Sequence, residues 1–497
     1  MFARLAFSLL LGSSIFGAAS DSVPPAVASL IQRSLAVQRG RIGFQFVDVQ
    51  SGQILAELNS ANFLTPASNT KLYTTALALV RLGPNYKFQT ELRTTSPWTP
   101  GQATVSGLQL IGGGDPNLSG RVLPYALHSV DTDPLAAFKE LASKLAAAGV
   151  RRIDGDVTGV ATRYPGDLYP DGWTLDDAIY GYGAPVSALT LNDNAISLTV
   201  SPTAEGELAD VALQPSTGHF IILNEVTTNI SSKTDIHVTR HPGSSELVLW
   251  GTIGTTQNAW REDVAIDDPA LFAAEALIDA LEEQQITVRG GARSQYTESS
   301  EASTSPSPAA SSSGTLLAVH DSAPLWEDLE IINKVSQNLH AEMLLREVAH
   351  CSGGAATLAA GAAEREAFLR QIGITHDGSG FALDDASGLA RQDLTTPQST
   401  VALLRYMWQR PEHDVWLQSL PIGGLDGSLE HRFRNVSGAE RVHAKTGSIS
   451  HVNALSGYIE TNRHRWRAFS VMVNATAGPD AEVRSFIDQL CALFLNE

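Results

Sequence analysis

Hydrophobic and polar positions alternate near the start of the chain in a pattern that predicts a β-hairpin. The stretch RIGFQFVDVQSGQILAEL begins at Arg41, and its apolar side chains fall on alternate positions from Ile42 to Phe46. The alternation changes phase at Val47 before a Ser-Gly turn, which weakens the pattern without removing it. Apolar residues then recur at helical spacing and end at Gly83, so a helix is expected after the hairpin.

The C-terminal end of the chain repeats this combination of strands and a helix. The stretch NALSGYIETNRHRWRAFSVMVN predicts two strands around a polar turn, and AEVRSFIDQLCALFL has the apolar spacing of an amphipathic helix. Because strand pairs lie next to a helix at both ends, we expect one α/β domain that is assembled from the two ends of the chain.

The middle of the chain has a different character, with short β-like runs that are rich in Gly, Thr and Asp. Two helical patterns interrupt these runs, DPLAAFKELASKLAAAGV and PALFAAEALIDALEEQQI. We therefore predict one or two inserted domains of mixed β and α structure at 88–295, followed by a Ser/Pro-rich linker or loop at 296–315. The terminal domain then takes 25–87 as its first part and 316–497 as its second part.

The composition is that of a globular protein without affinity for nucleic acid. At 497 residues the chain is long enough for about three domains. Its hydrophobic share of 43% and charged share of 18% are typical of soluble globular proteins. The net charge of -19 argues against nucleic acid as a partner, because phosphate binding requires a basic surface.

The first 19 residues have the pattern of a secretory signal peptide. A positive Arg4 is followed by a mostly apolar run and then by small residues up to Ala19. The run is too short to span a bilayer, and no later segment is apolar enough to do so. We therefore predict a protein that is periplasmic or otherwise exported, without a transmembrane segment after cleavage. In an oxidising compartment Cys351 and Cys491 could form a disulfide, which the sequence leaves open.

One short stretch could carry nucleophilic chemistry. In TPASNTKLYTTALAL, Ser68 stands three residues before Lys71, and no other lysine follows a serine at this spacing. Residues three apart on a helix share a face, so the lysine can hydrogen-bond the serine hydroxyl and take its proton. A lysine acts as a base only if burial or nearby positive charge lowers its pKa from ~10.4. The alternative interpretation is a serine that caps a helix and a solvated lysine one turn later.

A second cation is available in RVHAKTGSISHVNALSGYIE, where Lys445, Thr446 and Gly447 precede an alternating apolar stretch. Lys445 could raise the positive potential around Lys71, which would lower the pKa of that lysine, and could also attract an anionic substrate. The glycine would let the backbone of a ligand approach closely. The alternative interpretation is an ordinary turn before a strand.

A third motif is formed by Ser336 and Asn338 in KVSQNLHAEMLLRE, just before an amphipathic helix. Alone it is a weak signal, because a simple helix cap gives the same pattern and another Ser-x-Asn copy begins at Ser60. The Ser60 copy precedes Ser68, whereas the Ser336 copy lies between the other two motifs.

The order Ser-x-x-Lys, Ser-x-Asn, Lys-Thr-Gly is typical of penicillin-binding proteins and serine β-lactamases. The chain resembles the D-alanyl-D-alanine carboxypeptidase/endopeptidases of the low-molecular-mass, class C penicillin-binding protein family. Further similar stretches appear in the family's order from about residue 25 to the C-terminus, namely GGGDPNLSG, GAPVSALTLNDN, DDASGLARQDLTTP and LPIGGLDGSLEHRFRN. The long insertion between Ser68 and Ser336 is also typical of this family, and smaller serine β-lactamases lack it.

The resemblance implies an α/β fold of the penicillin-binding, serine β-lactamase-like type, with an antiparallel sheet between helices and accessory domains inserted. It also implies a serine-type D-Ala-D-Ala carboxypeptidase that acts on peptidoglycan stem peptides and is inhibited by β-lactam antibiotics. Such an enzyme needs neither a metal nor an organic cofactor.

Residue by residue, the resemblance implies a catalytic set. Ser68 would be the nucleophile and Lys71 its general base. Ser336 would help to pass the proton toward the leaving amine, and Asn338 would hydrogen-bond both the substrate amide and Lys71. Lys445 would supply positive potential.

The resemblance also implies substrate-binding residues on the third motif. Thr446 would hold the carboxylate of the substrate, and Gly447 would allow its backbone to approach. The backbone N–H groups of Ser68 and Ser448 would form the oxyanion hole, which usually contributes ~10²–10³ in rate per donor.

Two other functions use the same residues. One is a β-lactamase or D-amino-acid esterase, and the other is a non-catalytic protein that binds peptidoglycan or β-lactams. The chain contains neither Gly-x-Ser-x-Gly nor His-Glu-x-x-His, so a triad hydrolase and a zinc peptidase lack an anchor. Because every motif residue lies outside 90–312, the sequence further predicts that the inserted segment is dispensable for acyl chemistry.

Overall fold

The computed structural model describes residues 22–230, 233–241, 243–297, 314–375 and 380–496. The predicted signal peptide and most of the Ser/Pro-rich segment lie outside these ranges. Within them, no helix is both long enough and apolar enough to cross a bilayer. Cys351 is an exposed free thiol and Cys491 a buried one, so the disulfide that the sequence left open is not formed in this structure.

Five strands from the two ends of the chain form one antiparallel sheet in the order β19-β20-β21-β1-β2. Their bounds are β1 (Arg41–Asp48), β2 (Ile54–Leu58), β19 (Val442–Ile449), β20 (Val452–Glu460) and β21 (Trp466–Asn474). β1 pairs with β21 along its whole length, so strands from the two ends of the chain lie side by side in one sheet, as expected. The predicted hairpin is also confirmed, and its phase change coincides with a register shift between Phe46 and Val47.

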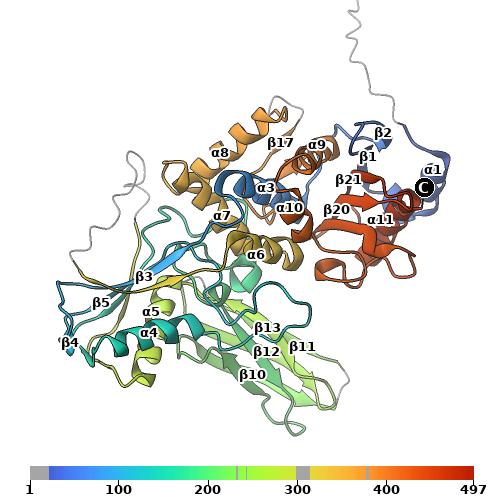
Figure 1. The fold of residues 1–497 in the computed structure, drawn as a ribbon. Helices are drawn as coiled ribbons and strands as arrows, with labels where there is room; N and C mark the ends of the chain where they lie inside the picture. Colours follow the sequence, from blue (N-terminus) through green and yellow to red (C-terminus); the bar gives the residue numbers. More distant parts are fainter. Residues whose placement is uncertain (1–21, 231–232, 242, 298–313, 376–379, 497) are drawn as a thin grey trace, which may run out of the picture.

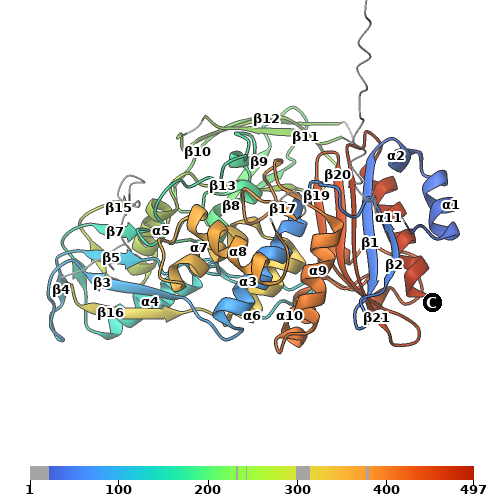
Figure 2. The ribbon, with the colours of Figure 1, turned by 90° about the horizontal axis from the view of Figure 1, so that it is seen from above.

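Helices cover both faces of this sheet (Figure 1 and Figure 2). On one face lie α1 (Pro25–Arg33), α2 (Leu35–Gln38) and α11 (Asp480–Leu495). The ring of Phe46 stacks on Phe469 within the sheet and on Phe494 of α11, at centroid distances of 5.4 and 4.0 Å. On the other face, α9 (Pro397–Trp408) packs against β1, β20 and β21.

A group of helices lies between this sheet and the inserted region (Figure 2). It comprises α3 (Thr70–Leu82), α6 (Leu325–Glu330), α7 (Asn338–Cys351), α8 (Leu358–Gln371) and α10 (His413–Ser419). The helix predicted after the hairpin is confirmed as α3. It ends at Gly83, whose φ of 79° is a conformation that glycine adopts without strain.

The inserted region begins and ends at neighbouring points in space, because β3 (Gln89–Thr94) pairs with β16 (Leu316–Asp321). Both strands belong to a second five-stranded sheet, β15-β7-β5-β3-β16. The other strands of this sheet are β5 (Leu108–Ile111), β7 (Val157–Val160) and β15 (Ala292–Gln295). The sequence assigned 316–321 to the second part of the terminal domain, whereas in the structure this segment completes the sheet of the insert.

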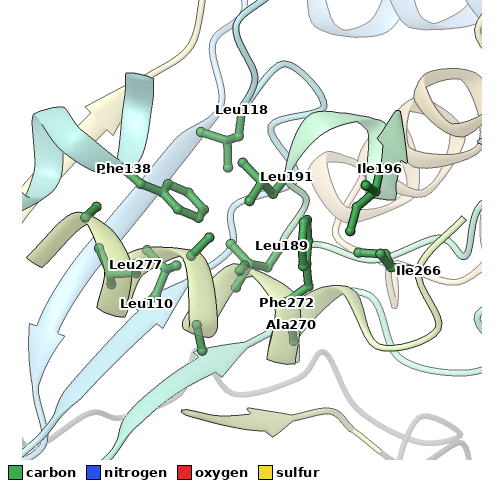
Figure 3. Packing of buried hydrophobic residues seen from close by; sticks show 14 of the residues in the cluster. Leu110, Leu118, Phe138, Leu189, Leu191, Ile196, Ile266, Ala270, Phe272 and Leu277 are labelled. Atoms are coloured by element: carbon green, nitrogen blue, oxygen red, sulfur yellow. The ribbon is translucent and has the colours of Figure 1, made fainter. Parts of the chain in front are cut away.

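A small three-stranded sheet, β14-β6-β4, consists of β4 (Thr104–Val105), β6 (Arg152–Ile153) and β14 (Thr287–Val288). Two further three-stranded sheets, β13-β8-β9 and β10-β12-β11, complete the insert. Their bounds are β8 (Ala195–Ser201), β9 (Asp210–Gln214), β10 (Ile221–Asn229), β11 (Asp235–Thr239), β12 (Glu246–Gly254) and β13 (Trp260–Ala265). The predicted helices are confirmed as α4 (Ala136–Ala147) and α5 (Pro269–Glu283). Figure 3 shows Phe138 of α4, Phe272 of α5 and Leu191 gathered in the core, to which all four sheets of the insert contribute residues.

Candidate active site

Ser68 lies in a single 3₁₀ turn, Ala67–Asn69, directly before α3. The preceding Ala67 has a φ of 47°, a conformation that costs a non-glycine residue energy and is common at functional sites. Gly388 packs against this turn so closely that a β-carbon on it would collide with the Ala67 carbonyl. The side chain of Ser68 does not cap α3, so the capping interpretation of the serine is wrong.

The amine of Lys71 is fully buried and donates three hydrogen bonds. Its acceptors are Ser68 Oγ at 2.9 Å, Asn338 Oδ1 at 2.5 Å and the Ser387 carbonyl at 2.8 Å. The interpretation of Lys71 as a solvated surface lysine is therefore wrong. Two of the three predicted motifs meet at this one nitrogen.

Burial lowers the pKa of Lys71 to about 7, against an ordinary value of 10.5. The carboxylates of Asp385, Glu342 and Asp393 oppose this shift, because negative charge favours the protonated amine. Burial therefore brings the pKa of Lys71 close to neutral pH, so the amine loses its proton as pH rises through about 7.

The amine of Lys445 joins the Lys-Thr-Gly motif to the Ser336 motif. Its Nζ donates to Ser336 Oγ at 2.8 Å and to the Thr446 carbonyl at 3.0 Å. Burial, and after it the charge of Lys71, lowers the pKa of Lys445 well below its ordinary value. In the part of the chain that the structure describes, no carboxylate lies within 4.0 Å of this amine to offset its burial.

Ser336 is placed by an unusual backbone. It follows the π-helical turn η5 (Ile331–Val335) and has a φ of 70°, in the left-handed region. This conformation turns the chain so that Ser336 Oγ reaches Lys445 while Asn338, at the start of α7, reaches Lys71. The other Ser-x-Asn copy takes no part in the site, because Ser60 Oγ donates to Glu57 instead.

The third motif lies on β19, an edge strand of the sheet. The backbone N–H of Ala444 points away from β20 and donates to the Pro421 carbonyl. Because N–H groups alternate in direction along a strand, those of Thr446 and Ser448 point the same way. This leaves a row of donors along the open edge, beside the turn that carries Ser68.

Neighbouring residues fix the edge in place. Thr446 Oγ1 donates to Ser428 Oγ at 2.7 Å, and Asn69 Nδ2 donates to the Lys445 carbonyl at 3.2 Å. A β-carbon at Gly447 would collide with the carbonyl of Pro66, so only glycine lets the strand approach the Ser68 turn.

The inserted region contributes directly to the site. The Tyr182 carbonyl accepts a hydrogen bond from Asn338 Nδ2 at 2.8 Å, and Asp193 accepts one from Gln337 Nε2 at 2.7 Å. Trp173 Nε1 donates to Asp385 at 3.0 Å. These contacts argue against a dispensable insert, since two of them support residues of the Ser336–Asn338 motif and the third supports Asp385, in the loop whose Ser387 carbonyl accepts from Lys71.

A buried charge network ties the insert to α7. His340 of α7 lies between Asp193 and Asp328, with ring nitrogens 3.0 and 2.7 Å from their carboxylates. Asp193 also pairs with Arg121 at 2.5 Å, and Asp328 accepts from Asn117 Nδ2 at 2.8 Å. Burial alone would lower the pKa of His340, but the two carboxylates outweigh it and raise the pKa to about 8.

Sequence reasoning named the side chains of the site and missed the groups that orient them. The Ser387 and Tyr182 carbonyls act through the backbone, which no residue type reveals. Asp385 and Asp193 lie in DDASGLARQDLTTP and GAPVSALTLNDN, two stretches that already carried the resemblance, and these were the available signal.

The architecture is that of a known class of protein. The structure aligns with penicillin binding protein 4 (dacB) from Haemophilus influenzae at a TM-score of 0.78 and 22% identity, covering 95% of this chain and 99% of that one. The same protein complexed with a novel β-lactam aligns at a TM-score of 0.74. The chain therefore has the penicillin-binding protein 4 fold, and the predicted fold class is confirmed.

Residues 25–494 match the family model of the D-Ala-D-Ala carboxypeptidase 3 (S13) family, and the chain belongs to that family. A D-alanyl-D-alanine carboxypeptidase from Actinomadura sp. (strain R39) is 33% identical over 450 residues, or 88% of this chain and 78% of the relative. The D-alanyl-D-alanine carboxypeptidase DacB from Haemophilus influenzae is 25% identical over 454 residues, or 89% and 87%. The resemblance drawn from the motifs is thus confirmed.

The His340 network gives a testable pH dependence of stability. A pKa that is raised from 6.5 to about 8 on folding contributes stability that is complete below pH 6.5 and is lost as pH rises through 8. We expect the free energy of unfolding of the wild type to fall by on the order of 2 kcal/mol across this window. Urea unfolding of wild type and His340→Gln at pH 6, 7, 8 and 9 measures it.

The exposed His464 is the control for this measurement. His464→Gln should keep the pH dependence of the wild type, whereas His340→Gln should flatten it and lower the stability at pH 6. Parallel curves for all three proteins would show that His340 does not titrate within the network.

Proposed function

We propose that this protein is a serine-type D-Ala-D-Ala carboxypeptidase and endopeptidase that cleaves peptidoglycan stem peptides through an acyl-enzyme on Ser68. The observation that carries the proposal is the bond between Lys71 Nζ and Ser68 Oγ, 2.9 Å long, from an amine whose pKa lies at about 7. Near neutral pH, a base with this pKa is unprotonated in a large fraction of the molecules and still has enough proton affinity to activate a hydroxyl. The family to which the chain belongs has the same activity in its name.

Acylation begins when Lys71 is neutral. A neutral amine has two N–H groups and one lone pair, and three partners surround it. Asn338 Oδ1 and the Ser387 carbonyl can only accept, so they take the two N–H groups. The lone pair is left facing Ser68, whose proton passes to Lys71 as Oγ attacks the carbonyl of the substrate.

The departing D-residue needs a proton on its amine. Ser336 Oγ is bonded to Lys445 Nζ and belongs to the same motif as Asn338, which is bonded to Lys71. We assign to Ser336 the transfer of the proton from the Lys71 side to the leaving amine. Water then attacks the ester, and the serine is regenerated.

The open edge of β19 suits an extended peptide. A substrate laid along this edge would add a strand to the sheet, as peptides do in β-augmentation. The N–H of Ser448 would then join that of Ser68 as the oxyanion hole, and Thr446 with Lys445 would receive the terminal carboxylate. The carboxylate would supply the negative charge that the buried Lys445 lacks.

Substrate and location follow from the same proposal. Peptidoglycan stem peptides lie outside the cytoplasm, which agrees with the predicted signal peptide at residues 1–19. β-Lactam antibiotics would acylate Ser68 as substrate analogues. Release of D-Ala from a D-Ala-D-Ala peptide separates this function from a β-lactamase, an esterase or a non-catalytic sensor.

The nucleophile can be tested with a fluorescent penicillin. Ser68→Ala should remove covalent labelling and leave the fold unchanged, because among the described residues no other hydroxyl is hydrogen-bonded to the Lys71 amine. Labelling is measured by gel fluorescence and by intact mass. Ser60→Ala is the matched serine control and should label as the wild type does; residual wild-type stoichiometry in Ser68→Ala would point to a different nucleophile.

The base can be tested by charge and by pH. Lys71→Arg keeps a cation but stays protonated, so we expect acylation to slow by about 10³-fold. In the wild type, the neutral form of Lys71 is the active form, and its fraction grows as pH rises through 7. Stopped-flow acylation from pH 5 to 9 should therefore show a rate that rises below about pH 7 and levels off above it. A rate independent of pH in this range would contradict the role of Lys71.

Recognition of the carboxylate can be tested on the substrate itself. Amidation of the terminal carboxylate should lower kcat/KM for a D-Ala-D-Ala peptide by about 10²-fold, because a charge-assisted hydrogen bond is lost. Thr446→Val should weaken cleavage of the free acid far more than cleavage of the amide. Equal rates for acid and amide in the wild-type enzyme would show that this part of the site does not bind the carboxylate.

A further inference from the structure

Behind Lys71 lies a loop whose centre is a buried carboxylate. Asp385 is fully buried and accepts hydrogen bonds from four consecutive backbone N–H groups, from one hydroxyl and from a tryptophan. The donors are the N–H groups of Ser387, Gly388, Leu389 and Ala390, the hydroxyl of Ser387 and Nε1 of Trp173, at 2.6 to 3.1 Å. One side chain thus determines the path of the loop from 385 to 390.

Three helices hold the same loop from other sides. Arg365 of α8 donates to the carbonyls of Leu383 and Asp385 at 2.7 and 2.6 Å. Glu342 of α7 accepts from the Ala386 N–H at 2.8 Å, and Thr74 of α3 donates to the Ala386 carbonyl at 2.7 Å. The next carbonyl along the chain belongs to Ser387, and it is the one that accepts from Lys71.

We propose that Asp385 is a positioning residue for acylation: it holds the Ser387 carbonyl where that carbonyl takes one N–H of Lys71 and leaves the lone pair directed at Ser68. The inference rests on the proposed function of Ser68 and Lys71. It adds that the direction of the base is set by a carboxylate that touches neither the nucleophile nor the base through a hydrogen bond.

Trp173 extends this arrangement to the inserted region. Its Nε1 is the donor to Asp385 that comes from the inserted region. The insert therefore supports the two acceptors of Lys71 other than Ser68. Trp173 acts on the Ser387 carbonyl through Asp385, and the Tyr182 carbonyl accepts from Asn338.

The charges around Lys71 make the proposal testable by pH. Burial would raise the pKa of Asp385, but its backbone donors and Trp173 outweigh burial and keep the pKa below the usual range, so it is ionised. Burial and then the charge of Asp385 raise the pKa of Asp393 well above its ordinary value, so Asp385 is the more acidic carboxylate of this pair.

The other charged groups that face this region are Glu342 and Arg346 on α7, Arg365 on α8 and Lys445 on β19. Removing the charge of Asp385 removes a contribution that raises the pKa of Lys71. The pH at which Lys71 becomes neutral should therefore fall.

The experiment compares Asp385→Asn with Asp384→Asn, in which the neighbouring carboxylate is exposed. The acylation rate by a fluorescent penicillin is measured from pH 5 to 9, together with melting temperature and the stoichiometry of labelling. For Asp385→Asn we expect a plateau rate about 10²-fold below that of the wild type, because the base is misdirected, and a rise of the rate that begins at lower pH. Asp384→Asn should match the wild type in both.

Trp173→Phe serves as a second variant that keeps an aromatic side chain and removes the donor. We expect full labelling stoichiometry, an unchanged penicillin concentration for half-saturation and an acylation rate constant that is about fivefold lower. This variant keeps the proposal testable if Asp385→Asn does not fold.

Three outcomes would overturn the proposal. The first is an Asp385→Asn protein that acylates with the plateau and pH profile of the wild type. The second is one that shows only a smaller labelled fraction with an unchanged profile, as expected for a purely structural residue. The third is a Trp173→Phe protein whose half-saturation rises while its rate constant is unchanged. If the wild type itself did not acylate at Ser68, the proposed function would fail instead.

Discussion

The burial of the Lys71 amine is the constraint on which the rest of the site depends. A charged amine without water or a counter-charge is costly, so burial drives this lysine toward its neutral form. Burial alone would also make it a weak base, and the carboxylates of Asp385, Glu342 and Asp393 pull its pKa back to about 7. A base for acyl transfer has to be neutral before the reaction and still strong enough to hold a proton during it. The site meets both conditions by placing neutral acceptors against the amine and negative charges one layer further out.

The surroundings of Lys71 come from segments at both ends of the chain. Ser68 and Lys71 follow the first hairpin, whereas Lys445 lies on the edge strand near the C-terminus. Pairing of β1 with β21 places these segments in one sheet, and Asn69 then bonds the Lys445 carbonyl directly. The Ser336 motif reaches the site through a π-helical turn and a left-handed residue. The left-handed residue brings Ser336 to the Lys445 amine and Asn338 to the Lys71 amine, so that each buried amine gains a side-chain acceptor.

The sequence predicted the side chains of the site but only part of the interactions that set their pKa values. Short spacings and their order predicted Ser68, Lys71, Ser336, Asn338 and Lys445 as site residues, and the structure places these side chains in hydrogen-bonded groups around the two lysine amines. The source of the Lys71 pKa shift could not be predicted, since burial depends on packing between segments that are hundreds of residues apart. The hairpin, α3, α11 and the helices of the insert were predictable from local periodicity. The position of residues 316–321 in the sheet of the insert was not predictable, because it depends on pairing with β3 rather than on the local sequence pattern.

The inserted region shows where reasoning from motif positions fails. A separable insert would contact the rest of the chain mainly at the points where the insert begins and ends, which lie at the β3–β16 pair. Here its loops also supply the Tyr182 carbonyl to Asn338, Asp193 to His340 and Gln337, and Trp173 to Asp385. Except for the exposed Tyr182, which contributes its carbonyl, the residues at these contacts are buried or half-buried, so the loss of a partner would leave a polar group with one hydrogen bond fewer. The insert therefore belongs to the same cooperative unit as the residues that it surrounds in the sequence, although it contributes no residue to the three motifs.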